Sequence, residues 1–159
     1  QDFPSPKRLV NVSKSCVRVA RLFGFDPKVA FLSHSTFGKP ISKNTKHVRD
    51  AIEILKQEKV DFNFDGEMQP DVALNPIYQE IYPFSKIVGN ANILIMPALH
   101  SAAISTKLMK VFGGGKLIGP LLIGLGLPIE VAPLRSSTSD ILNLASIAAY
   151  SSDIIDYSN

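Results

Sequence analysis

The most constraining feature of this sequence is that helix-period and strand-period apolar patterns alternate through its first hundred residues. Apolar side chains recur every three or four residues after Pro6 and stop at Gly24, which predicts an amphipathic helix. The short apolar run at residues 28–33 has the length and composition of a buried strand. A second helix is predicted from about Asn44 to Glu58, because its apolar residues fall on one face: Val48, Ala51, Ile52 and Leu55.

The later segments continue this alternation. Further strands are predicted at 60–66, at 91–97 as the central strand, at 117–123 and at 129–131. Further helices are predicted at 69–74, 101–112 and 140–150, the last N-capped by Ser137, Thr138 or Ser139, whereas residues 76–89 look irregular. Strands that alternate with helices imply an α/β fold, here a three-layer α/β/α arrangement around a mostly parallel sheet.

Length and composition narrow the class of protein. A chain of 159 residues can bury one core, so we expect a single domain over residues 1–159 with flexible ends at 1–8 and 151–159. It contains no apolar run long enough for a transmembrane helix, so we expect no membrane partner. The single cysteine, Cys16, excludes an internal disulfide and favours a cytoplasmic location. The start at Gln1, without methionine, is expected for a C-terminal fragment of a longer chain.

The positive charge is concentrated in the first part of the chain. Residues 1–59 hold twelve basic and five acidic side chains, a net charge of +7, whereas residues 60–159 carry −4. Such asymmetry indicates a polyanionic partner or simply a solvated basic face. We expect no nucleic-acid partner, because no nucleic-acid-binding motif is present. A small phosphorylated ligand fits better.

In parallel sheets, ligands bind beyond the carboxyl ends of the strands. The turn at 33–38 follows a predicted strand and offers hydroxyl groups that can hold a phosphate, from Ser33, Ser35 and Thr36. Four cations come next, and the last three have helical spacing: Lys39, Lys43, Lys46 and Arg49. The alternative is a polar loop that leads into a solvated helix.

Other polar groups favour structural roles. His34 cannot easily face its serine neighbours as in a nucleophile triad, and His47 and His100 lack metal-ligand spacing. The carboxylates of Asp65, Glu67 and Asp71 could share a cation, but helix capping is the favoured interpretation. The glycines before Lys116 are expected to end a helix, because Leu117 stands where a phosphate-binding loop needs Ser or Thr.

Five segments, in this order, together resemble one family: KVAFLSHSTFG (28–38), DGEMQPDVAL (65–74), NANILIMP (90–97), GPLLIG (119–124) and DILNLA (140–145). The chain is similar to the second half of phosphate acetyltransferases. It resembles more closely the phosphotransacetylase-like C-terminal domain of large bacterial malic enzymes, from about Ser13 to Tyr150. The resemblance implies an α/β/α subdomain that pairs with a symmetry mate as a homodimer and forms part of a CoA cleft.

The resemblance also identifies where the chain departs from the transferases. Their Ser-Arg pair before the last helix falls on Pro133 and Leu134, neither of which donates a side-chain hydrogen bond. Asp140 matches the family aspartate. Arg135 lies one residue beyond the position of the family arginine and could replace it if the local alignment shifts by one residue. An aspartate and an asparagine that the family carries after the strand predicted at 91–97 are replaced here by Ala98 and Ala103. Lys107 keeps a positive charge in the same segment.

The preferred hypothesis is therefore a regulatory domain that binds acetyl-CoA or CoA as an effector and has no catalytic residues or cofactor of its own. The resemblance assigns NADP or NAD and a divalent metal to other domains of a malic enzyme that decarboxylates malate to pyruvate. The expected ligand-binding residues are Ser33, Ser35, Thr36, Lys39, Lys43, Lys46, Lys107, Ser136 and Ser137. One alternative is a working phosphate acetyltransferase that uses Asp140 and Arg135. A third possibility is a domain that only mediates assembly, along residues 117–127.

Overall fold

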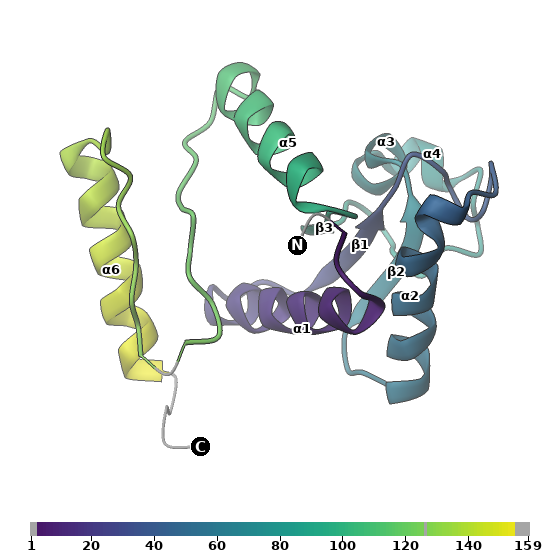
Figure 1. Ribbon diagram of the computed structural model, residues 1–159, viewed down its shortest axis with the longest axis horizontal. Coiled ribbons are helices and arrows are strands. Elements are labelled where there is room, and N and C mark those ends of the chain that lie inside the picture. Colours follow the sequence, from purple (N-terminus) through teal and green to yellow (C-terminus); the bar gives the residue numbers. More distant parts are fainter. Residues whose placement is uncertain (1–2, 126, 155–159) are drawn as a thin grey trace. The chain divides into compact units, whose positions relative to one another are not determined.

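The computed structural model describes residues 3–125 and 127–154 (Figure 1). The sequence predicts one domain, but the chain divides into two compact units, one up to Lys107 and one from Leu108. Each unit is described by itself. The helix α5, Leu99–Phe112, begins in the first unit and ends in the second.

The first helix confirms the sequence-based prediction. Helix α1 spans Pro6–Leu22, with Pro6 in its first turn and the Ser5 hydroxyl accepting a hydrogen bond from the Arg8 N–H. It buries Leu9, Val10, Ser13 and Val17. Residues 6–8 of the expected flexible N-terminal end are helical, and residues 1–2 of it lie outside the described residues.

A three-stranded parallel sheet forms the centre of the first unit. Strand β1, Lys28–Leu32, lies between β2, Asn63–Met68, and β3, Ile93–Ile95. The prediction that 91–97 is the central strand is wrong, because β3 lies at an edge of this sheet. The four residues from Val29 to Leu32 are almost fully buried, as expected for a strand between two neighbours.

Strand β2 begins later and ends later than predicted. The sequence places a strand over 60–66 that stops at a glycine turn, whereas β2 runs through Gly66 to Met68. A Cβ at Gly66 would lie 2.6 Å from the Phe31 carbonyl oxygen, and its φ of +141° is one that other residues rarely adopt. The glycine therefore allows close approach of β1 and does not end the strand.

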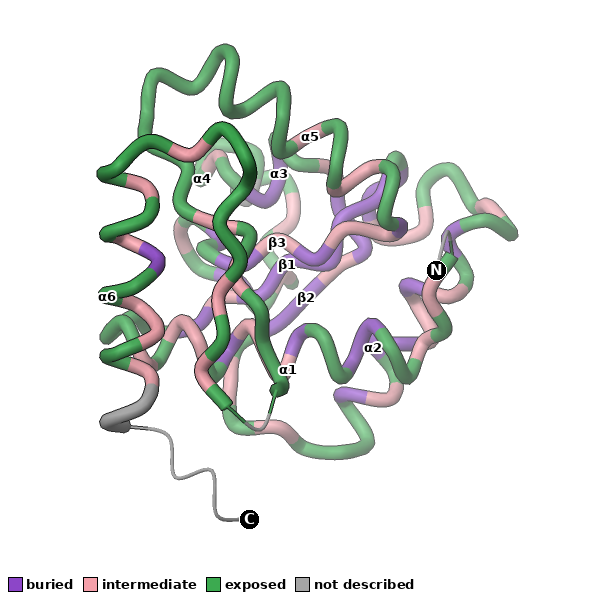
Figure 2. Tube along the Cα trace, turned by 60° about the vertical axis from the view of Figure 1, so that its left-hand side comes forward, coloured by how far each residue is buried: buried purple, intermediate pink, exposed green. Residues whose placement is uncertain are grey.

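Each face of the sheet has its own apolar cluster. Helices α1 and α2, Lys46–Glu58, cover one face and pack against Val29, Phe31, Phe64, Ile93 and Ile95. A short 3₁₀ turn, Lys43–Thr45, precedes α2. The other face holds Ala30, Leu32 and Met68, covered by α3, Pro70–Leu74, and by the chain around Ile87 and Ala91. The three-layer α/β/α prediction is confirmed, and Figure 2 shows the buried residues concentrated on these strands.

Three predicted segments are corrected. Residues 76–89, expected to be irregular, contain the short helix α4, Pro76–Gln79. Residues 117–123 and 129–131 form no strand within the described ranges; there, the Leu122 N–H donates to the Glu130 carboxylate at 3.1 Å. An apolar run becomes a strand only where a neighbouring strand takes its backbone hydrogen bonds.

The last helix has one of the predicted N-caps, but it begins two residues before the predicted start at Asp140 and extends beyond Tyr150. Helix α6 spans Thr138–Ile154, and the Ser137 hydroxyl accepts from the Asp140 N–H at 3.2 Å, which makes Ser137 the N-cap. Residues 151–154 are therefore helical, and residues 155–159 of the expected flexible end lie outside the described residues. The helices of the described ranges are all too short or too polar to span a membrane.

Candidate functional site

The loop after β1 is fastened to the end of β2. The Ser33 N–H donates to the Met68 carbonyl at 2.9 Å, and the Phe37 N–H donates to the Glu67 carbonyl at 2.7 Å. Thr36 and Lys39 exchange a pair of backbone hydrogen bonds of 3.1 Å each, which closes the turn. The loop therefore has a defined shape at the carboxyl edge of the sheet, where the sequence predicts a ligand site.

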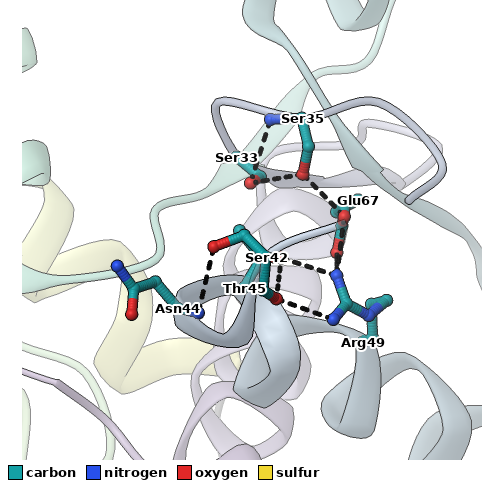
Figure 3. Close-up of polar contacts among 7 residues, drawn as sticks. All are labelled: Ser33, Ser35, Ser42, Asn44, Thr45, Arg49 and Glu67. Carbon is teal, nitrogen blue, oxygen red and sulfur yellow. Dashed lines mark hydrogen bonds and ion pairs between the residues drawn. The ribbon is translucent and has the colours of Figure 1, made fainter. Parts of the chain in front are cut away.

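A buried ion pair lies beneath this loop (Figure 3). The Glu67 side chain is 0% exposed, and the Arg49 Nη1 lies 3.0 Å and 3.1 Å from its two carboxylate oxygens. The Ser35 hydroxyl donates to the same carboxylate at 2.6 Å. Glu67 thus joins β2 to α2 and to the loop. The expectation that Glu67 caps a helix is wrong, because its carboxylate is turned inward onto Arg49.

The Arg49 guanidinium also holds the turn that precedes α2. Its Nη1 donates to the Thr45 hydroxyl at 2.5 Å, and its Nη2 donates to the Ser42 carbonyl at 2.9 Å (Figure 3). Since Glu67 balances its charge, Arg49 contributes little net positive charge to the surface. Arg49 therefore acts as a structural cation within this cluster.

The hydroxyl groups expected to hold a phosphate serve the protein itself. Ser33, Ser35 and Thr36 are all buried. The oxygens of Ser33 and Ser35 are 3.2 Å apart, and the Thr36 hydroxyl accepts from the Gln69 N–H at 3.2 Å. Their predicted ligand-binding role stays a prediction, and each would have to give up or share an internal hydrogen bond to fulfil it.

The cations that follow do not form one convergent set. Lys46 pairs with Asp50 at 2.6 Å on the same helix, whereas Lys39 and Lys43 are exposed. Lys39 lines an open cleft of about 470 Å³ whose wall consists of Phe37, Gly38, Lys39, Pro40, Ile41 and Arg49. Lys39 is thus a predicted ligand-binding lysine that the structure places in a cleft wall.

Asp65, Asp71 and His47 in the first unit have structural roles. The Asp65 carboxylate accepts from the N–H groups of Gly66 at 2.9 Å and Lys86 at 2.7 Å, so it fixes a loop and caps no helix. Asp71 does lie in the first turn of α3, as predicted. His47 Nε2 lies 2.9 Å from the Pro97 carbonyl oxygen. No group of three potential metal ligands is present among the residues that the structure describes.

A second, more polar pocket lies within the second unit. Its volume is about 320 Å³, and three of its lining side chains are cationic: Lys110, Lys116 and Arg135. Asp140, Ser136 and Asn143 also line it, together with Gly115, Leu117, Ile118, Gly119, Pro133 and Leu144. Three cations against one carboxylate leave this pocket with an excess of positive charge, which suits an anionic ligand.

Asp140 is held in its ionised form at the start of α6. Its carboxylate accepts from the Ser137 hydroxyl at 2.7 Å and from the Ser137 N–H at 2.9 Å. These hydrogen bonds, with the charges of Lys116 and Lys110, lower the pKa of Asp140 below its ordinary value. Lys116 lies 3.8 Å from the carboxylate and also bonds to the Ser139 hydroxyl.

The positions that the resemblance matches to functional side chains of the transferases carry only some of the polar groups expected there. Pro133 lines the pocket without a donor, and the Leu134 side chain is fully exposed. Arg135 does line the same pocket as Asp140, as the slipped alignment requires. Ser137 is committed to capping α6, whereas Ser136 lines the pocket. Lys107 is exposed on α5, in the first unit.

Sequence reasoning missed Lys110 and Lys116 as pocket residues. Lys116 stands in the glycine motif that was expected only to end a helix. That part is confirmed, since α5 stops at Phe112 and Gly114 has a φ of +62°. The glycine motif itself was the available signal. A helix that stops there lets the chain turn back, and in the structure Lys116 lies beside Asp140 at the start of α6.

Comparisons with known proteins agree with this geometry. The chain matches the family described as phosphate acetyl/butaryl transferase over residues 1–149. It is 46% identical to an NADP-dependent malic enzyme of Rhizobium meliloti over 149 residues, 94% of this chain and 20% of that protein. It is 33% identical to a phosphate acetyltransferase of Bacillus subtilis, over 92% of this chain and 46% of that protein.

Solved structures show the same similarity. A phosphotransacetylase from Streptococcus pyogenes superimposes with a TM-score of 0.89 at 35% identity, over 95% of this chain and 46% of that one. The chain thus spans about a fifth of the malic enzymes and about half of the phosphate acetyltransferases that it matches. The family match over residues 1–149 and the agreement of its α/β fold with a solved phosphotransacetylase lead to one conclusion: the chain belongs to the phosphate acetyl/butaryl transferase family.

Proposed function

We propose that this chain is an acetyl-CoA-binding regulatory domain that does not itself transfer acetyl groups. The observation that supports this best is the environment of Asp140. A general base works best when its pKa lies near the operating pH. The ordinary pKa of an aspartate already lies below that range, and the hydrogen bonds from Ser137 with the charges of the nearby lysines lower the pKa of Asp140 further, which makes it a weaker acceptor for a thiol proton.

The rest of the pocket also favours binding over chemistry. Acyl transfer from a phosphate needs donors that stabilise the charge that develops in the transition state. Pro133 and Leu134 offer none at the two positions where the transferases carry a serine and an arginine. The three cations at Lys110, Lys116 and Arg135 still suit the phosphate groups of CoA.

In this proposal, the intact protein oxidatively decarboxylates malate to pyruvate in the cytoplasm. NADP or NAD and a divalent metal bind in parts of the protein beyond this chain. The 46% identity to a malic enzyme supports this assignment. Because coupling between two binding sites is reciprocal, malate and nucleotide should change the affinity of the intact protein for acetyl-CoA by the same factor as acetyl-CoA changes theirs.

The test is calorimetric titration of the intact protein with acetyl-CoA. Arg135→Gln and Lys116→Gln should each weaken binding on the order of tenfold, as expected for a charge-assisted hydrogen bond to phosphate. Neutralising Lys39, Lys43 or Lys46 tests the predicted sites of the first unit. Arg8→Gln is the matched control, since Arg8 is exposed on α1 and distant in sequence from every predicted site. Unchanged affinity in both pocket variants would remove the proposed site.

The alternative of a working phosphate acetyltransferase is favoured by one observation. Arg135 and Ser136 line the same pocket as Asp140, so a guanidinium and a hydroxyl stand near the family aspartate. Formation of acetyl-CoA from acetyl phosphate and CoA by the intact protein, abolished in Asp140→Asn, would establish this function and overturn our preference.

We also propose that the chain associates as a homodimer through residues 117–127. Six large apolar side chains of this segment are exposed: Leu117, Ile118, Leu122, Ile123, Leu125 and Leu127. Water-exposed apolar surface of this extent is typical of an association site. Light scattering should give twice the chain mass, reduced toward the monomer by a paired Leu125→Asp and Leu127→Asp variant, whereas a monomeric parent chain would contradict this.

A further inference from the structure

A second exposed apolar segment lies in the first unit, from the end of α3 through α4 into the chain that follows. Its large apolar side chains are 40% to 78% exposed: Leu74, Ile77, Tyr78, Ile81, Phe84 and Val88. Exposed apolar side chains gathered in this way are typical of a protein association site, where aromatic residues are enriched. We call this segment the 74–88 surface.

The backbone beneath these side chains is fastened to the sheet. The Lys28 Nζ donates to the Val88 carbonyl at 2.8 Å, and the Lys86 N–H donates to the Asp65 carboxylate at 2.7 Å. Between them, the Ile87 side chain is buried in the apolar cluster under α3. The 74–88 surface is therefore ordered before any partner arrives, which lowers the entropic cost of docking.

The 74–88 surface has little net charge. Its one acidic residue, Glu80, and its one basic residue, Lys86, are both exposed. It therefore offers little attraction to a polyanion, and its residues line neither of the clefts described above. An apolar protein surface is a better match for it than a small anionic ligand.

The length of the relatives indicates which protein surface this is. The chain spans 20% of the malic enzyme to which it is 46% identical. In the proposed function, the other domains of that protein are tethered to this one, so they meet its exposed surfaces at high effective concentration. The homodimer proposed through residues 117–127 does not account for the 74–88 surface, because residues 117–127 belong to the other compact unit.

We propose that the 74–88 surface docks this domain onto the part of the intact protein that decarboxylates malate. The inference rests on the proposed function and names the surface through which its regulation passes. A ligand shifts a distant equilibrium only through interactions that differ between the two states. A docked contact at the 74–88 surface supplies such an interaction between the acetyl-CoA site and the malate site.

Hydroxyl-radical oxidation of the intact protein, followed by mass spectrometry, tests the docking directly. Phe25, which follows α1 and is 60% exposed, is the matched control for Phe84, which is 65% exposed. In the folded protein, Phe84 should be oxidised several-fold more slowly than Phe25, and denaturant should make the two rates equal. Equal rates in the folded protein would overturn the proposal. Protection of Phe84 that disappears on dilution would identify a second copy of the chain as the occupant and would overturn it as well.

Charged variants of the intact protein test whether this contact carries the coupling. Paired Ile77→Asp and Ile81→Asp should raise the oxidation of Phe84 to the rate of Phe25. The same variant should still bind acetyl-CoA but lose the effect of acetyl-CoA on malate affinity. Both side chains are largely exposed, so the fold should persist.

Val12→Asp is the control for these variants, since Val12 is exposed on α1, which covers the opposite face of the sheet. It should change neither the oxidation of Phe84 nor the coupling. Full coupling in the paired variant would overturn the proposal.

The docking surface and the proposed function can fail separately. An intact protein that binds no acetyl-CoA but protects Phe84 would remove the proposed function and leave the docking surface. An intact protein that binds acetyl-CoA but oxidises Phe84 at the rate of Phe25 would remove only the docking surface.

Discussion

Arg49 and Glu67 form an ion pair in which the Glu67 side chain is completely buried and the Arg49 side chain is 32% exposed. The pair connects α2, β2 and the loop that follows β1, through Ser35, Thr45 and the Ser42 carbonyl. Because the two partners differ in exposure, removal of each one has a different cost. A buried charge without a partner is far more expensive than an exposed one.

The first prediction follows from this asymmetry. Arg49→Met should lower the free energy of unfolding by about 3–5 kcal/mol, because it leaves the Glu67 carboxylate buried and unpaired. Glu67→Gln should cost less, since Arg49 can turn toward water. The measurement is urea denaturation of both variants. The double variant should recover part of the loss; strict additivity of the two single effects would show that the pair is not coupled.

The second prediction concerns Gly66. In Gly66→Ala the new Cβ would meet the Phe31 carbonyl oxygen within β1, so we expect a loss of several kcal/mol, with separation of β1 and β2. Gly24→Ala is the matched control, since it also has a positive φ but no atom within 4 Å of the new Cβ. The control should cost about 1 kcal/mol. Equal thermal shifts for the two variants would contradict close approach at Gly66.

The third prediction concerns the pH dependence at Asp140. Its pKa is lowered in the folded protein, so its contribution to stability is present above the unfolded value and disappears as the pH falls through the folded one. The difference in thermal stability between the parent chain and Asp140→Asn should therefore be largest at neutral pH and vanish in strong acid. An NMR titration should find the pKa below 3.8, and Ser137→Ala should raise it. A difference that grows toward acid would refute this assignment.

The fourth prediction concerns Cys16. Burial on α1 raises the pKa of its thiol, so less thiolate is present at neutral pH than for an exposed cysteine. Iodoacetamide should react with the folded chain more slowly than with free cysteine, and denaturant should remove the difference. Reaction at the free-cysteine rate in the folded chain would show that this part of α1 opens readily.

The sequence by itself predicted the elements whose patterns are local. The apolar periodicity of α1 and α2 fixes which face each helix buries, and Ser137 caps α6 because hydroxyl acceptors suit that position in any context. The family followed from the order of five segments, each read from adjacent residues. The match of Asp140 to the family aspartate needed no coordinates either.

The tertiary structure decided what depends on partners distant in sequence. The sequence does not predict the ion pair between Glu67 and Arg49, because the two residues are eighteen positions apart. They come into contact only because β2 and α2 pack together. For the same reason, β3 proved to be an edge strand and residues 117–123 formed no strand. An apolar run indicates that a segment avoids water, but it becomes a strand only where the fold places another strand within hydrogen-bond distance. In the same way, a hydroxyl group becomes a structural group only where the fold brings a hydrogen-bond partner to it.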